Sequence, residues 1–99
     1  MPKRVVVDTR DLMFRAKLRA AAESAGAEVV RDAAAGDLVV LDALSPDAAD
    51  RIRRWVAQGT RVLAYGSHLA ADQLRLARDA GAVAVPNSQV EARLRELLA

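Results

Sequence analysis

Two aspartates, Asp8 and Asp42, are the side chains best placed to do chemistry in this chain. Each one ends a short apolar run, residues 4–7 before Asp8 and residues 37–41 before Asp42. Unbroken Val-rich runs of this length are typical of strands buried on both faces, as in a parallel sheet. Because open α/β sheets place ligands at the carboxyl ends of their strands, we expect both carboxylates at that edge.

Two kinds of chemistry suit a pair of carboxylates in this position. They could hold a divalent cation such as Mg²⁺, which takes one or two protein carboxylates together with water and phosphate oxygens. Alternatively, Asp8 and Asp42 only accept hydrogen bonds from the amides of loops and helix N-termini. The residues by themselves leave both interpretations open.

Ser67 and His68 form a second polar cluster, after the apolar run 61–65 and Gly66. Here a histidine could act as a base or contact a phosphate, and the serine could act as a nucleophile. Neighbouring residues do not orient each other as a nucleophile and its base do. We therefore interpret Gly66 and Ser67 as a turn and a helix N-cap, with His68 at the first helical position.

The composition limits the class of protein. Ninety-nine residues predict one domain spanning 1–99, and the absence of cysteine excludes disulfides, a thiolate nucleophile and cysteine-based metal sites. The net charge is only +2, and most arginines alternate with acids along expected helices, so nucleic-acid binding is not favoured. No stretch is long and apolar enough for a membrane span, and no signal-peptide pattern is present, so we expect a cytoplasmic protein without membrane association.

Hydrophobic periodicity predicts five strands and four helices. The expected strands are 4–8, 27–30, 37–42, 61–65 and 82–85, and the expected helices are 12–25, 46–58, 69–80 and 89–98. Expected N-caps are Asp11, Ser45 and Ser67, together with a capping box of Ser88 and Glu91. The expected buried stripes include Trp55 and Val56 in the second helix and Leu69 in the third.

Alternating strands and helices predict a three-layer α/β fold of the flavodoxin-like, doubly wound type, with strand order 2-1-3-4-5. The first and last helices cover one face, and the other two cover the opposite face. Segment 31–36 has no helical pattern and reaches at most about 20 Å. It allows a taut parallel crossover or an antiparallel hairpin between the second and third strands. We favour the crossover, because the third strand is apolar enough for burial on both faces.

Over nearly its whole length, the chain resembles the receiver domain of two-component response regulators (CheY-like). The resemblance implies that Asp42 is a phospho-acceptor, that Asp8 helps to hold Mg²⁺, and that the hydroxyl residue after the fourth strand is Ser67. Two residues depart from the family's pattern. Val85 stands where the resemblance implies a lysine, and Thr9 stands where it implies a second acid. The helix between strands two and three is also missing.

These departures favour a stand-alone pseudo-receiver, which is a signalling or protein-interaction module that works without phosphorylation, catalysis or a cofactor. One alternative is a genuine phospho-accepting receiver that uses Asp42 and Mg²⁺. Another is a module that binds nucleic acid weakly through arginine-rich helix faces.

The missing helix also predicts a partner surface. We expect Val6, Val29 and Val39 to be incompletely covered, and an uncovered apolar patch usually marks an interaction site. Trp55 fits either the core or such an interface. We therefore expect a twofold homodimer that uses this face or the outer surface of the last strand and helix, besides an unknown protein partner.

Overall fold

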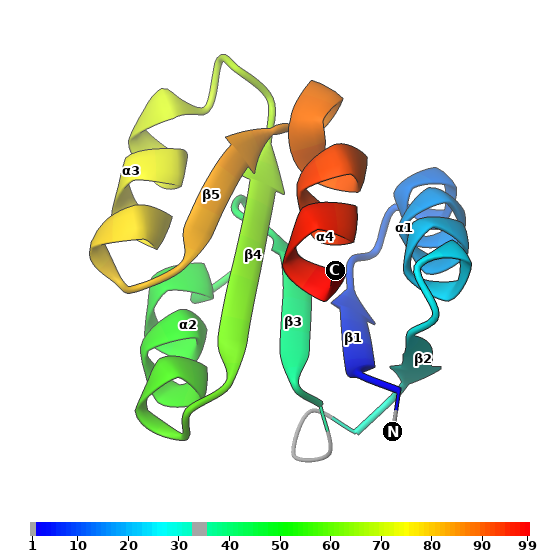
Figure 1. Ribbon diagram of the computed structural model, residues 1–99. Coiled ribbons are helices and arrows are strands. Elements are labelled where there is room, and N and C mark those ends of the chain that lie inside the picture. The colour runs from blue at the N-terminus through cyan, green and yellow to red at the C-terminus, as the bar shows by residue number, and fades with distance from the viewer. Residues whose placement is uncertain (1, 33–35) are drawn as a thin grey trace.

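Strands and helices alternate along the chain and build a three-layer α/β fold (Figure 1). The computed structural model describes residues 2–32 and 36–99. In chain order the elements are β1 (Arg4–Asp8), α1 (Leu12–Ser24), β2 (Glu28–Val30), β3 (Leu38–Asp42), α2 (Ala48–Ala57), β4 (Arg61–Gly66), α3 (Ala71–Asp79), β5 (Val83–Pro86), a 3₁₀ turn (Asn87–Gln89) and α4 (Val90–Leu98).

The five strands form one sheet in the order β2-β1-β3-β4-β5, and every neighbouring pair is parallel. The predicted strand order is therefore confirmed. Because β2 and β3 flank β1 and run parallel to it, the favoured crossover is also confirmed, and the hairpin alternative is wrong. Within the described residues, no helix lies between Val30 and Leu38; residues 33–35 of that connection lie outside the described part of the chain.

Side-chain alternation along the strands divides the core into two layers. On one face Val5, Leu38 and Leu63 pack beneath α1 and α4, which lie side by side (Figure 1). On the other face Leu41 and Ala64 pack beneath α2 and α3. The predicted distribution of helices between the two faces is confirmed. Each fully buried Leu or Val side chain in these layers contributes about 1.5–3 kcal/mol by leaving water.

Of the four expected helix caps, only the first forms. The carboxylate of Asp11 accepts hydrogen bonds from the amides of Met13 and Phe14, at 2.9 and 3.1 Å, so this prediction is confirmed. In the other three helices the residue at the N-cap makes no side-chain capping bond, and those predictions are wrong. The residues that should have capped them are Ser45, Ser67 and Ser88.

The loops after β3 and β4 explain why two of these serines do not cap. The hydroxyl of Ser45 donates to the carbonyl of Asp42, and α2 starts only at Ala48. Ser67 accepts a hydrogen bond from the amide of Leu69, and α3 starts at Ala71. Both serines therefore stabilise tight turns that come before their helices. Ser88 lies inside the 3₁₀ turn, which replaces the expected capping box.

Several burial predictions also need correction. Leu69 is 85% exposed because it lies in the turn before α3, and Val56 is 39% exposed. Val6 and Val39 are buried, so the expectation that they are left uncovered is wrong, although Val6 borders a cleft beside β2. Val29 pairs with Val5 and therefore faces the layer beneath α1 and α4 instead of the opposite face.

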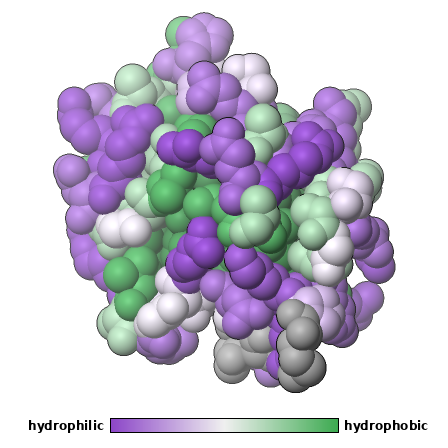
Figure 2. All heavy atoms as spheres, viewed as in Figure 1, coloured by the Kyte–Doolittle hydropathy of each residue, from purple (hydrophilic) through white to green (hydrophobic). Residues whose placement is uncertain are grey.

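The surface is mixed in polarity. On the face drawn in Figure 2, hydrophilic residues cover the helices, and hydrophobic residues show in the hollow between α3 and α4, over β5. Among the described residues, no helix is both long and apolar enough to cross a membrane.

Candidate functional site

The carboxyl ends of β1 and β3 lie next to each other and border a cavity of about 440 Å³. Asp8 pairs with Leu41, and Asp42 comes one residue later. Both aspartates line the cavity, together with Thr9, Asp11 and Arg51. The prediction that Asp8 and Asp42 would lie on adjacent strands at this edge of the sheet is therefore confirmed.

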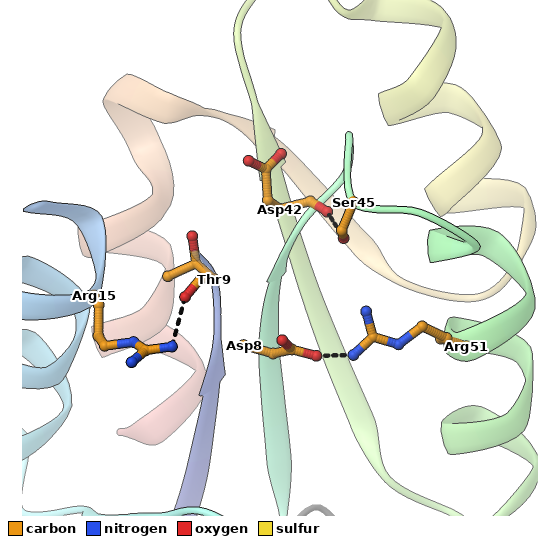
Figure 3. A network of polar contacts seen from close by, with 6 residues as sticks. All are labelled: Asp8, Thr9, Arg15, Asp42, Ser45 and Arg51. Carbon is orange, nitrogen blue, oxygen red and sulfur yellow. Dashed lines mark hydrogen bonds and ion pairs between the residues drawn. The ribbon is translucent and has the colours of Figure 1, made fainter. Parts of the chain in front are cut away.

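The two carboxylates nevertheless point in different directions. Asp8 shares the face of its partner Leu41, which belongs to the layer beneath α2 and α3. Asp42 pairs with Tyr65, whose side chain belongs to the layer beneath α1 and α4. In Figure 3 the Asp8 carboxylate points sideways toward α2, whereas the Asp42 carboxylate points beyond the end of the sheet. The pair therefore does not converge on one point.

Asp8 is neutralised by a residue of this chain. Its carboxylate forms an ion pair with the guanidinium of Arg51, which comes from α2 (Figure 3). The side chains of Arg51 and Asp8 are 28% and 36% exposed, so the pair is partly shielded from solvent. The guanidinium also lies over the ring of Trp55, 5.0 Å from the ring centroid, in a cation–π arrangement. A fixed positive charge therefore stands beside the carboxylate that could have held a cation.

Asp42 and Asp11 use their carboxylates to hold local backbone. Asp42 accepts a hydrogen bond from the amide of Leu44 at 2.9 Å, and Asp11 caps α1 as described above. Within the described residues, no three acidic or histidine side chains gather into a group that could hold a metal ion. The contact of Asp42 is of the kind expected in the alternative interpretation, in which the carboxylate accepts a hydrogen bond from a loop amide. Asp8 accepts its bond from Arg51 instead, so both carboxylates already have partners within the chain.

A buried hydroxyl pair crosses the end of β3. The hydroxyl of Tyr65, on β4, donates to Oγ1 of Thr9, directly after β1, at 2.6 Å. The tyrosine is 2% exposed, and its ring stacks on Phe14 with 5.0 Å between centroids. Thr9 is held further by Arg15, whose guanidinium donates to the Thr9 carbonyl at 2.8 Å (Figure 3). This linkage joins α1, β1 and β4 around Asp42.

Burial is the main cause that raises the pKa of Tyr65 above its ordinary value of 10.0. The hydrogen bond with Thr9 acts in the opposite direction, and the negative charges of Asp42 and Asp11 raise the pKa further. The phenol therefore keeps its proton at neutral pH and serves as a hydrogen-bond donor. Tyr65 thus packs inward with its hydroxyl close to the loop after β1.

One row of paired residues crosses three strands at this edge. Asp42 pairs with Tyr65, and Tyr65 pairs with Val85. The hydroxyl residue in register with Asp42 is therefore Tyr65, whereas Ser67 and His68 lie in the turn beyond the end of β4. Val85 is 6% exposed and packs in the core, so it brings no positive charge to the row.

Sequence reasoning missed the role of Arg51. A signal for it was present, because Arg51 and Trp55 are four residues apart on one helix and so share a face. Trp55 is half-buried and packs against the layer beneath α2 and α3, yet it also lines a cleft at the surface. The core interpretation of Trp55 is therefore confirmed in part, and the interface interpretation stays a prediction.

Most of the arginines on the outer helix faces are paired with acids of the same helix. These ion pairs are Arg19–Glu23, Arg53–Asp50, Arg75–Asp72, Arg93–Glu96 and Arg95–Glu91. This pattern is what a solvated helix face shows, and it leaves little continuous positive charge for a nucleic-acid backbone.

No known protein-family model matches this sequence, and no curated protein matches it. Solved structures do match its fold. A response regulator from Thermotoga maritima is 20% identical, with a TM-score of 0.76 over 98% of this chain and 94% of that chain. The signal receiver domain of a DNA-binding response regulator from Colwellia psychrerythraea is 16% identical, with a TM-score of 0.76. The match covers 96% of this chain and 97% of that chain. An orphan response regulator of H. pylori is 14% identical, with a TM-score of 0.73. The match covers 96% of this chain and 92% of that chain.

These similarities extend over nearly the whole of each chain. The protein therefore has the fold of a response-regulator receiver domain, as the resemblance in its sequence implied. At these levels of identity the likeness concerns the fold alone.

Proposed function

We propose that this protein is a pseudo-receiver, a signalling module that binds another protein and works without phosphorylation or catalysis. The receiver fold supports a signalling role. The observation that carries the proposal is the ion pair between Asp8 and Arg51 at the carboxyl ends of the strands.

The physical argument concerns charge. Transfer of a phosphoryl group to an aspartate brings negative oxygens toward a negative carboxylate, so positive charge must surround the transferred group. Here Arg51 is already engaged with Asp8, and Asp42 pairs across the sheet with a buried tyrosine. On β5, the residue that pairs with this tyrosine is Val85, which is uncharged. Arg10 also lines the cavity, on the loop after β1, but no cation stands in register with Asp42 on β4 or β5. These contacts support a site that is poorly equipped for phosphoryl transfer.

The test is incubation with acetyl phosphate and Mg²⁺, followed by intact-mass measurement. We expect no adduct on the native chain. A gain of about 80 Da, one phosphoryl group, that disappears in Asp42→Asn would overturn the proposal. An authentic receiver treated in parallel shows that the reagent is active, and circular dichroism shows that Asp42→Asn remains folded.

A genuine phospho-receiver is the second candidate. Its support is the position of Asp42, which is half-buried at the end of β3 and lines the 440 Å³ cavity. The same mass measurement decides between the two candidates, because only the phospho-receiver forms an adduct that depends on Asp42.

A further inference from the structure

A second cleft lies where β2 stops short of its neighbour. The last residue of β2, Val30, pairs with Val6, whereas β1 continues through Val7 and Asp8. Beyond the end of β2 is a cleft of about 640 Å³. It is separate from the cavity that Asp42 lines, although Asp8 and Arg51 border both.

The walls of this cleft are strongly basic. Arginines reach it from three places: Arg15 and Arg19 from α1, Arg31 from the segment after β2, and Arg51 from α2. Among its described lining residues, Asp8 is the one carboxylate; outside the lining, Glu23 of α1 forms an exposed ion pair with Arg19. Two of these arginines are fixed in place, because Arg15 donates to the Thr9 carbonyl and Arg51 to Asp8 (Figure 3).

The rest of the cleft is apolar. Val6 and Val30 come from the two strands, and the indole of Trp55 comes from α2. Trp55 is half-buried, although it is the largest side chain in the protein, so part of its ring remains open to a ligand. An apolar surface between fixed positive charges suits a ligand that combines an apolar group with negative charges on either side.

We propose that this cleft binds an acidic segment of a partner protein. The carboxylates of that segment meet the arginines of the two walls, and an apolar side chain between them packs against Trp55 and the two valines. This proposal rests on the proposed function, because it names the chemistry of the partner that a phosphorylation-independent module would bind.

Charge argues against two other occupants. A second copy of this chain that met the first across a twofold axis here would bring the same four arginines together. The adjoining outer surface of α2 adds Arg54, so the repulsion would extend beyond the cleft. A nucleic acid would need positive charge along a longer track, and three of the four exposed arginines of α3 and α4 are paired with acids of their own helices.

Trp55 provides a direct readout, because it is the only tryptophan in the chain. The probe is a synthetic peptide in which Leu alternates with Glu. A second peptide carries Lys at the Glu positions, and a third carries Ser at the Leu positions. We expect a saturable change in tryptophan fluorescence with the acidic apolar peptide, a weaker one with the serine peptide and none with the lysine peptide.

Charge reversal in the cleft tests the location. Arg19→Glu and Arg31→Glu change exposed side chains that line the cleft but do not contact Asp8 or the Thr9 carbonyl. Each substitution should lower the affinity for the acidic apolar peptide about tenfold, and raising the salt concentration should lower the affinity of the native protein for it. Arg75→Glu is the matched control, since it makes the same charge change at an exposed position on α3 and should leave affinity unchanged.

Several results would overturn the proposal. They are a fluorescence response that does not saturate, an equal loss of affinity in Arg75→Glu, and tighter binding of a single-stranded oligonucleotide than of the peptide. Sedimentation that shows a dimer broken by Arg19→Glu would assign the cleft to a second copy instead. Phosphorylation of Asp42 by acetyl phosphate would overturn the proposed function and leave the peptide result standing, so the two failures can be told apart.

Discussion

The carboxylate of Asp8 on β1 is ion-paired with the guanidinium of Arg51 on α2, and 43 positions separate the two residues in the chain. The contact joins the end of an inner strand to a helix of the layer that the Asp8 side chain faces. It also places a positive charge permanently at the edge of the sheet where parallel α/β proteins bind ligands. The same pair thus bears on the stability of the protein and on what its site can bind.

A double-mutant cycle should detect this ion pair. Because both side chains are about one-third exposed, we expect Asp8→Asn and Arg51→Gln to show a coupling free energy of about 0.5–1 kcal/mol in urea unfolding. The exposed pair Asp72–Arg75 on α3 is the control, with an expected coupling of about 0.3 kcal/mol. Additive effects of Asp8→Asn and Arg51→Gln would contradict the prediction.

Replacing the buried phenol should lower stability at neutral pH. In Tyr65→Phe the hydrogen bond to Thr9 is lost, while the ring and its stacking on Phe14 are kept. We expect the free energy of unfolding to fall by about 1 kcal/mol. The measurement is urea denaturation followed by circular dichroism, and an unchanged midpoint would show that the bond adds nothing.

The same variant should also change the pH dependence of stability. Because burial raises the pKa of Tyr65 in the folded state, the folded protein holds this proton more tightly than the unfolded chain does. The resulting stability is fully present below pH 10.0 and is lost as the pH rises through the higher folded-state pKa. Native protein should therefore lose more stability above pH 10.0 than Tyr65→Phe, and parallel curves would refute this account.

Gly81, between α3 and β5, should tolerate alanine less well than Gly26. Both glycines have positive φ angles, so alanine is strained at either position, at a cost of about 1–2 kcal/mol. At Gly81 the new Cβ would also come within 3.1 Å of Cγ2 of Val56, whereas at Gly26 nothing lies within 4 Å. The thermal unfolding midpoint of Gly81→Ala should lie below that of Gly26→Ala. Adding Val56→Ala to Gly81→Ala should restore part of the difference, because it removes the side chain that the new Cβ meets.

The contrast between real and expected caps can be measured. Asp11→Ala removes the two hydrogen bonds that cap α1 and should lower stability by about 1 kcal/mol. Ser88→Ala should change stability little, because Ser88 lies in the 3₁₀ turn and α4 has no side-chain cap. Equal losses in the two variants, measured by urea unfolding, would contradict this assignment of caps.

Local sequence patterns predicted the elements and their order. The apolar runs that end at Asp8 and Asp42 indicate buried strands, because they are short and rich in β-branched valine. The topology followed from the same patterns, since parallel strands joined by right-handed crossovers allow few arrangements. The capping of α1 by Asp11 was also predictable, because its partners lie two and three residues away.

Register and long-range contacts decided the site itself. Ser45 could have capped α2 or stabilised a turn, and in the structure its hydroxyl donates to the Asp42 carbonyl in the turn after β3. Whether Tyr65 or Ser67 stands beside Asp42 depends on how β3 and β4 are aligned, because a register shift of two residues would exchange them on the same face. The pairing of Asp8 with Arg51 depends on where α2 packs. The sequence by itself thus determined which carboxylates reach the edge of the sheet, and only the tertiary structure decided what neutralises them, because electrostatic partners are set by distance in space.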